Sequence, residues 1–324
     1  MTVELPISID DARAARRRIA PFLNATPLRE YKELNDLLGG GIRVLVKHEN
    51  HQPTNAFKVR NGLAAITALD EEQRKRGVVC GTRGNHGQGV AFAGQKLGVP
   101  VTVVVPHENS SEKNSAMRSF GARVIECGED YDAAVAESER LSRDEGLTVI
   151  HSTNDSSVLA GAATITLEVV EQAEALDAMV IAVGGGSQAV GAMAVLQALR
   201  PAVAVYGVQA EGAPAIYESW RAGRPIGRIP PRTIADGIAT GSSYDLTFPA
   251  LRAGLAGFVL VSDDEIIDAM RTMIQCTHNL TEPAGAAGLA GAAKLRKELE
   301  GKTVCVILSG ANVDGVTLRR CVVG

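Results

Sequence analysis

Short apolar runs alternate with amphipathic segments along almost the whole of this chain. Runs such as Val101–Val105 and Thr303–Leu308 contain almost no polar residue, which is typical of strands buried on both faces. Segments such as Asp263–Thr277 place apolar residues at helical spacing. This alternation predicts parallel sheets covered by helices. The expected strands are Val44–His48, Val78–Cys80, Val101–Val105, Arg123–Glu126, Val149–Ile150, Ala178–Val183, Val203–Val208 and Thr303–Leu308.

Helices are expected between these strands, and one longer stretch has no periodic pattern. Arg221–Ser243 is rich in Pro, Gly and Arg. It is predicted to be a long connection, and long connections in compact domains are often functional. The expected helices are Ala56–Leu69, Gly87–Leu97, Ser111–Phe120, Tyr131–Arg143, Ser157–Ala175, Gln188–Leu199, Asp263–Thr277 and Pro283–Leu299.

The length of the chain predicts more than one domain. With 324 residues it exceeds what a single hydrophobic core usually supports. Residues 77–153 form a continuous β-α block that the rest of the pattern encloses. We therefore expect a small domain at 77–153 and a large domain that combines 1–76 with 154–324.

Composition and charge exclude several classes of partner. The sequence is 45% hydrophobic and 22% charged, with a net charge of −4, as in compact globular proteins. Its one basic cluster, Arg16-Arg17-Arg18, lies beside Asp10 and Asp11, which favours a solvated helix face over a nucleic-acid or membrane surface. No apolar run approaches the ~18 residues of a membrane helix. The scattered cysteines form no C-x-x-C pair, so we expect reduced thiols in a cytoplasmic protein.

Lys58 is the first candidate for chemistry. It follows a Pro-containing turn, His51–Phe57, beyond the carboxyl end of the expected strand Val44–His48, which is where open α/β folds bind ligands. A lysine amine that loses its proton in a desolvated pocket can form a Schiff base with a cofactor aldehyde. A lone lysine is usually a surface charge, so this interpretation depends on the segments that accompany it.

A glycine-rich turn supplies the second segment. Gly184-Gly185-Gly186-Ser187 follows an expected strand and opens a helix. Backbone amides at such a helix start bind phosphate, and glycine lets the anion approach closely. Two other interpretations remain open at this point. The turn can be a tight turn without a ligand, or a dinucleotide site with Gly191 as a further glycine and Glu211 as the ribose-binding acid.

Two further polar segments also follow expected strands. The loop Gly84-Asn85-His86-Gly87-Gln88-Gly89 satisfies its own backbone poorly, so we expect it to close on a ligand. Asn85 can donate to a phenolate oxygen, and backbone amides from Thr82 to His86 can bind a carboxylate. The hydroxyl of Ser309 is a plausible partner for a pyridine nitrogen. An amine, an amide loop, a phosphate turn and a hydroxyl together suit pyridoxal phosphate.

The four segments Pro53–Lys58, Gly84–Gly89, Gly184–Ser187 and Ser309–Asn312 stand in a characteristic order and spacing. They resemble the fold-type II pyridoxal-phosphate enzymes, which are similar to the tryptophan synthase β subunit. Within that group the chain most resembles the threonine/serine dehydratases and serine racemases. The resemblance implies an α/β fold with two open, parallel-sheet, three-layer domains and pyridoxal 5'-phosphate between them. It also implies a homodimer.

The resemblance also implies roles for individual residues. Lys58 is expected to form the Schiff base, while Phe57 packs beside the ring, Asn85 bonds the ring hydroxyl and Ser309 meets the ring nitrogen. Glu282 matches a family glutamate near the cofactor. The phosphate is assigned to Gly184, Gly185, Gly186, Ser187 and Gln188, and the substrate carboxylate to Thr82, Arg83, Asn85 and His86.

Several positions depart from the family's pattern. Directly before the Gly-Asn-His-Gly loop, the racemase carries a serine that acts as a second acid/base. Arg83 stands there in this chain. Its guanidinium stays protonated and is no base at neutral pH, so efficient racemisation is not expected. Arg83 can instead hold a substrate carboxylate or face solvent. Asn55 replaces a usual glycine, and Arg60-Asn61 a usual Arg-Gly, which leaves the size and shape of the substrate open.

The metal site and the regulation of several relatives are not expected here. The metal site of those relatives needs acids just after the strand Val203–Val208. Here Gln209 and Ala215 leave only Glu211, so no metal is predicted. The chain also ends soon after Asp314, which predicts no regulatory domain and no feedback control.

The predicted function is β-elimination from a small 3-hydroxy amino acid. L-threonine, giving 2-oxobutanoate and ammonia, is the first candidate, and L-serine, giving pyruvate, is the second. Bulkier or acidic substrates (3-phenylserine, 3-hydroxyaspartate or a hydroxyectoine-derived amino acid) stay open, as does an amino acid racemase. A nicotinamide-dependent oxidoreductase and a non-catalytic binding protein are the alternatives from other classes.

Overall fold

The larger of two sheets combines two strands from the start of the chain with four from its carboxyl-terminal half. The computed structural model describes residues 3–323. Six strands follow the order β1-β2-β10-β7-β8-β9. All neighbours pair in parallel except β1, an antiparallel edge strand. These strands are β1 (Leu28–Glu30), β2 (Arg43–His48), β7 (Ala178–Ala182), β8 (Ala204–Ala210), β9 (Gly257–Val261) and β10 (Thr303–Leu308).

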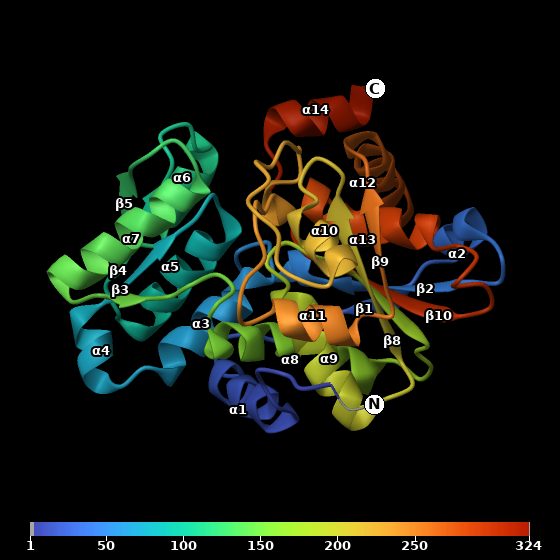
Figure 1. The fold of residues 1–324 in the computed structure, drawn as a ribbon, viewed down its shortest axis with the longest axis horizontal. Helices are drawn as coiled ribbons and strands as arrows, with labels where there is room; N and C mark the ends of the chain where they lie inside the picture. Colours follow the sequence, from blue (N-terminus) through green and yellow to red (C-terminus); the bar gives the residue numbers. More distant parts are fainter. Residues whose placement is uncertain (1–2, 324) are drawn as a thin grey trace.

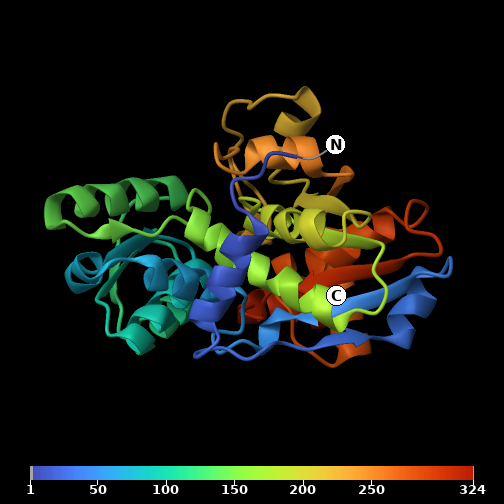
Figure 2. The ribbon, with the colours of Figure 1, turned by 90° about the horizontal axis from the view of Figure 1, so that it is seen from below.

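The smaller sheet is continuous in sequence and entirely parallel. Its order is β5-β4-β3-β6. All four strands come from within residues 77–153, and both views show this sheet beside the larger one (Figure 1, Figure 2). They are β3 (Val78–Gly81), β4 (Val101–Val105), β5 (Arg123–Glu126) and β6 (Thr148–Val149).

Helices cover both faces of each sheet. One face of the larger sheet packs on α2, α12 and α13, and the other on α1, α8 and α9. The smaller sheet lies between α7 and the pair α3 and α5. The α-helices are α1 (Ile9–Ile19), α2 (Lys32–Leu38), α3 (Lys58–Ala68), α4 (Glu71–Arg76), α5 (Asn85–Leu97), α6 (Ser111–Ser119), α7 (Tyr131–Glu145), α8 (Ser156–Gln172), α9 (Ser187–Leu199), α10 (Ala215–Ala222), α11 (Phe248–Gly254), α12 (Asp263–Thr277), α13 (Pro283–Lys294) and α14 (Gly315–Val323), and the short 3₁₀ segments are η1 (Glu49–His51) and η2 (Asp236–Ile238).

Most predicted elements are confirmed, with ends that differ by a few residues. β1 and β9 were not predicted, because β1 is short and exposed and β9 begins with a glycine that weakens the strand pattern. The expected helix Gly87–Leu97 begins earlier, at Asn85. The long connection predicted at Arg221–Ser243 is irregular apart from the end of α10 and η2. None of the described helices is long and apolar enough to cross a membrane.

Candidate active site

The predicted site segments converge at one place in the fold. β2, β10 and β7 are neighbours, so the segments that follow them leave the same edge of the larger sheet. Two backbone hydrogen bonds join the turn before Lys58 to the segment that follows β10. Phe57 N donates to Ser309 O (3.0 Å), and Ala311 N donates to Asn55 O (2.8 Å). The loop after β3 faces this edge from the smaller sheet, and a cleft lies between them.

Lys58 is the first residue of α3 and extends into this cleft. Its Nζ donates to the carbonyl oxygen of Ser152 (3.2 Å) and lies 5.1 Å from the centre of the Phe57 ring. Burial lowers the pKa of the Lys58 amine to about 8, because a desolvated ammonium is less stable than the neutral amine. A larger share of this amine is therefore deprotonated near neutral pH than of an ordinary lysine.

The departure at Asn55 has a backbone explanation. Asn55 has φ +53° and an exposed side chain. Glycine adopts this left-handed conformation without strain, and asparagine tolerates it better than most residues. Asn55 therefore replaces the usual glycine while keeping the turn, and its exposed side chain gives no reason to expect an altered substrate.

The glycine-rich turn after β7 has the properties of a phosphate site. Gly186 has φ +97° and precedes α9. A Cβ on Gly185 would lie 1.9 Å from Thr153 Oγ1, so only glycine fits there. Within residues 3–323, no backbone amide from Gly184 to Gln188 donates to a protein acceptor. The Gln188 side-chain nitrogen is also buried without a partner, so this turn presents several free donors to an anion.

The dinucleotide interpretation of this turn is not supported. A Cβ on Gly191 would meet the backbone of Ala163 at 2.8 Å, so Gly191 allows α9 to pack on α8. Glu211 lies within 3.5 Å of Lys294, an ion pair that accounts for its carboxylate without a ribose.

Asn85 is held in a chain of polar groups in which Glu282 is buried and both asparagines are half-buried. Its side-chain nitrogen donates to Glu282 Oε1 (2.7 Å), and its side-chain oxygen accepts from Asn312 Nδ2 (2.7 Å). A Cβ on Gly310 would lie 2.6 Å from the same Glu282 oxygen, which explains the glycine after Ser309. Burial raises the pKa of Glu282 to about 7. This arrangement fixes the orientation of the Asn85 amide and leaves one of its N–H groups for another acceptor.

The start of α5 forms an anion site on the opposite wall. Within the described chain, the backbone amides of Arg83, Asn85 and His86 donate to no protein acceptor, while Thr82 Oγ1 accepts from Gly84 N (3.0 Å). Free amides at a helix N-terminus favour a carboxylate. Burial lowers the pKa of His86 to about 3, so its ring is neutral. Arg83 lines the cleft, half-buried, and its guanidinium has no hydrogen-bond or ion-pair partner among residues 3–323.

The loop Gly84–Gly89 is shorter than its sequence indicates. α5 already begins at Asn85, so the second half of the segment is helical. A Cβ on Gly87 would lie 2.5 Å from Met117 Sδ, and one on Gly89 would lie 2.4 Å from Lys58 O. These two glycines therefore bring α5 close to α6 and α3.

The sequence did not indicate a set of contacts across the mouth of the cleft. Lys113 Nζ, from α6, lies 3.0 Å from Asp236 Oδ2 of η2. Arg228 reaches from the long connection to Asp130 (2.8 Å) and Asp132 (2.7 Å) at the start of α7. Both bridges join the smaller sheet's helices to the same connection, so they depend on tertiary contacts far apart in the sequence.

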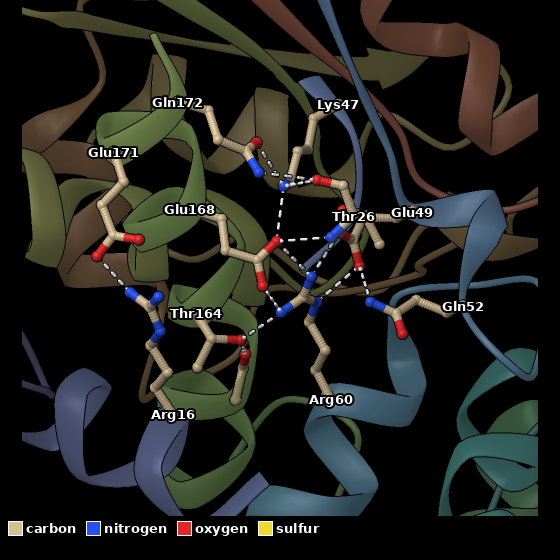
Figure 3. A network of polar contacts seen from close by, with 11 residues as sticks. Arg16, Thr26, Lys47, Glu49, Gln52, Arg60, Thr164, Glu168, Glu171 and Gln172 are labelled. Carbon is tan, nitrogen blue, oxygen red and sulfur yellow. Dashed lines mark hydrogen bonds and ion pairs between the residues drawn. The ribbon is translucent and has the colours of Figure 1, made fainter. Parts of the chain in front are cut away.

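A buried network of charges surrounds Arg60, in the first turn of α3 (Figure 3). Arg60 donates twice to Glu49 (2.7 and 2.9 Å) and twice to Glu168 (2.7 and 2.9 Å). Lys47 donates to Glu168 (2.6 Å) and to the Thr26 carbonyl (2.7 Å). Two cations face two carboxylates, so the charges balance, and the network anchors the first turn of α3 to η1 and α8.

Comparison with known proteins decides what this cleft is. Residues 19–310 match the family described as pyridoxal-phosphate dependent enzyme. The chain belongs to this family. The site fits the cofactor, because it offers a free amine, a glycine-rich anion site and polar groups between them. The predicted family, fold class and cofactor are therefore confirmed.

Relatives within the pyridoxal-phosphate family are ammonia-lyases. The chain is 36% identical to L-threonine ammonia-lyase of Thermotoga maritima over 98% of its length and 78% of the relative's. It is 35% identical to the L-threo-3-hydroxyaspartate ammonia-lyase of a Pseudomonas species, with 95% and 96% coverage. It also matches the biosynthetic L-threonine dehydratase of Pasteurella multocida at 35% identity but spans only 61% of that protein.

A solved structure of this pyridoxal-phosphate family has the same fold. Maize serine racemase superposes with a TM-score of 0.92 at 30% identity, covering 97% of this chain and 96% of that one. Both halves of the predicted resemblance, to dehydratases and to racemases, are thus confirmed. The chain is a pyridoxal-phosphate-dependent enzyme of the ammonia-lyase type.

Proposed function

We propose that this protein eliminates water from a 3-hydroxy amino acid and so releases ammonia and a 2-oxo acid. The observation that carries the proposal is the position of the Lys58 amine. The Lys58 amine has a lowered pKa and lies in a cleft between the glycine-rich turn at Gly184–Ser187 and the backbone amides at the start of α5. Pyridoxal phosphate supplies an aldehyde for covalent capture of amines and a ring that withdraws electrons from the substrate's α-carbon.

The chain's own residues supply binding and proton transfer. The free amides of Arg83, Asn85 and His86 bind the substrate's α-carboxylate, which places the α-carbon near Lys58. The Lys58 amine then takes the α-proton. A group near the phosphate turn protonates the departing β-hydroxyl. General-base catalysis by a positioned side chain contributes about 10²–10⁴-fold.

Ser309 favours elimination over reactions that need a long-lived carbanion. It follows β10 and is buried at the floor of the cleft. A hydroxyl facing the ring nitrogen does not hold that nitrogen protonated, as a carboxylate would, so the ring is a weaker electron sink. Departure of a β-substituent relieves the charge directly and suits such a ring.

L-threonine and L-serine are the first proposed substrates. The Arg83 guanidinium, which has no partner among residues 3–323, supports a second candidate, a substrate with an additional carboxylate such as 3-hydroxyaspartate. One relative is named for that activity. Comparing kcat/KM for threonine, serine and threo-3-hydroxyaspartate ranks the candidates. If Arg83→Ser lowers only the rate with 3-hydroxyaspartate, the acidic substrate is favoured.

Racemisation is the third candidate, supported by the likeness to serine racemase. The presence of Arg83 in place of a second acid/base argues against it. Incubation with L-serine followed by chiral analysis separates the two, since a racemase accumulates D-serine and a lyase accumulates pyruvate.

We also propose that residues 77–153 move as a small domain and close over the substrate. The bridges Lys113–Asp236 and Arg228–Asp130 across the mouth of the cleft support this division. By analogy with the family, we propose that the protein is a homodimer in the cytoplasm. Equilibrium sedimentation measures the oligomeric state.

The decisive experiment tests the covalent link. Borohydride reduction of the purified holoenzyme followed by peptide mapping should place the pyridoxyl group on Lys58. Lys58→Ala should lose this attachment and reduce oxo-acid release by at least the ~10²–10⁴-fold of a general base. An adduct on another lysine, or full turnover by the variant, would refute the proposal.

A further inference from the structure

The carbonyl that accepts from Lys58 belongs to an irregular segment. Ser152 lies between β6 and α8, where no strand pairing fixes the backbone. The same residue bonds a second group through its side chain, because Ser152 Oγ lies 2.9 Å from the Tyr131 hydroxyl. The Ser152 carbonyl oxygen therefore contacts the Lys58 amine, and the Ser152 hydroxyl contacts Tyr131.

Tyr131 is itself held firmly. It is the first residue of α7, directly after Asp130, whose side chain caps the helix by accepting from Ala133 N (3.0 Å). Arg228 bonds the carboxylates on both sides of Tyr131, Asp130 and Asp132. Burial raises the pKa of Tyr131, so its hydroxyl keeps its proton. An anchored hydroxyl of this kind can fix the position of a flexible partner.

The contact matters because the amine must be free to take a proton. When Lys58 is not bound to the cofactor, its amine needs an acceptor that turns the nitrogen lone pair toward the substrate. The Ser152 carbonyl accepts one N–H at 3.2 Å. A displacement of about 1 Å at a reacting group can cost on the order of 10²-fold in rate. Loosening Ser152 therefore slows proton transfer without removing a binding contact.

We propose that Tyr131 is a positioning residue for Lys58, acting through Ser152. The inference rests on the proposed function, since it assigns to Lys58 the proton transfer described above. It concerns a tyrosine that the sequence motifs did not indicate, contributed by α7, which packs on the smaller sheet. The start of α7 thereby becomes part of the machinery that orients the amine.

The test uses variants that remove single hydroxyls from the holoenzyme. Tyr131→Phe keeps the ring, and Ser152→Ala keeps the carbonyl. Each should lower kcat by about 10-fold or more while KM stays within about twofold. Each should also raise the primary isotope effect with α-deuterated substrate, because proton transfer becomes more rate-limiting. The double variant should resemble either single variant, since both remove the same hydrogen bond.

Controls separate this role from loss of structure. Tyr217→Phe is the matched control, because the Tyr217 ring packs on Phe258 away from the cleft; it should leave kcat and the isotope effect unchanged. Multiplicative losses in the double variant, or an unchanged isotope effect in both single variants, would overturn the proposal. A wild-type enzyme with no pyridoxyl adduct on Lys58 would instead overturn the proposed function.

Discussion

Removal of Arg60 should destabilise the protein strongly, because its guanidinium neutralises two buried carboxylates. Arg60, Glu49 and Glu168 are all buried. In Arg60→Met the side-chain volume is roughly kept, but Lys47 alone remains to face both Glu49 and Glu168. Breaking a buried ion pair by removing one partner costs about 3–5 kcal/mol, mostly because a charge is left buried without compensation.

The expected size can be stated as a melting temperature. Unfolding entropy of about 2.1 cal/mol/K per residue means that a chain of this length shifts its Tm by about 1.5 °C per kcal/mol. Arg60→Met should therefore lower Tm by about 4–8 °C in differential scanning calorimetry. Because the network anchors the turn that carries Lys58, the fraction of bound cofactor should fall as well.

Arg16→Met is the matched control. Arg16 pairs with Glu171 on the same helix α8, but both side chains are about half exposed (39% and 54%). Such pairs contribute about 0–1 kcal/mol, so this variant should shift Tm by less than about 2 °C. Adding Glu168→Gln to Arg60→Met should recover part of the loss. The reasoning is refuted if Arg60→Met costs no more than Arg16→Met, or if the second substitution lowers stability further.

Three further predictions concern the site. The pKa of Glu282 is raised to about 7, so its contribution to stability is full below the unfolded value near 4.5 and is lost as pH rises toward 7. Urea denaturation of wild type and Glu282→Gln across pH 4–8 should show a difference on the order of 3 kcal/mol that grows over this window. Gly185→Ala places a Cβ 1.9 Å from Thr153 Oγ1 and should weaken cofactor binding at least about 10-fold in an absorbance titration, corresponding to ~1.4 kcal/mol; wild-type affinity would contradict the close approach. Prolonged dialysis against a chelator should leave turnover unchanged, as expected from Gln209 and Ala215, and a loss that Mg²⁺ restores would show this prediction to be wrong.

The sequence by itself determined the elements and the local chemistry. Continuous apolar runs that alternate with helical patterns predict buried strands, and the polar or glycine-rich turns after them are expected at the carboxyl edges of parallel sheets. The same pattern predicts Lys58, Ser309 and the turn at Gly184–Ser187 as site residues. It left the substrate's size and shape open at Asn55, whereas the φ of +53° accounts for asparagine in place of glycine through the backbone alone.

Only the tertiary structure decided which distant residues surround the amine. Tyr131 and Ser152 are 21 residues apart, and Lys58 and Ser152 are 94 apart. No periodicity or motif links such positions, because their contact depends on how α3 and α7 pack around the smaller sheet. The contact between the buried side chains of Arg60 and Glu168 likewise depends on tertiary packing. Each is an ordinary charged residue in the sequence, and only the approach of α3 to α8 makes them partners.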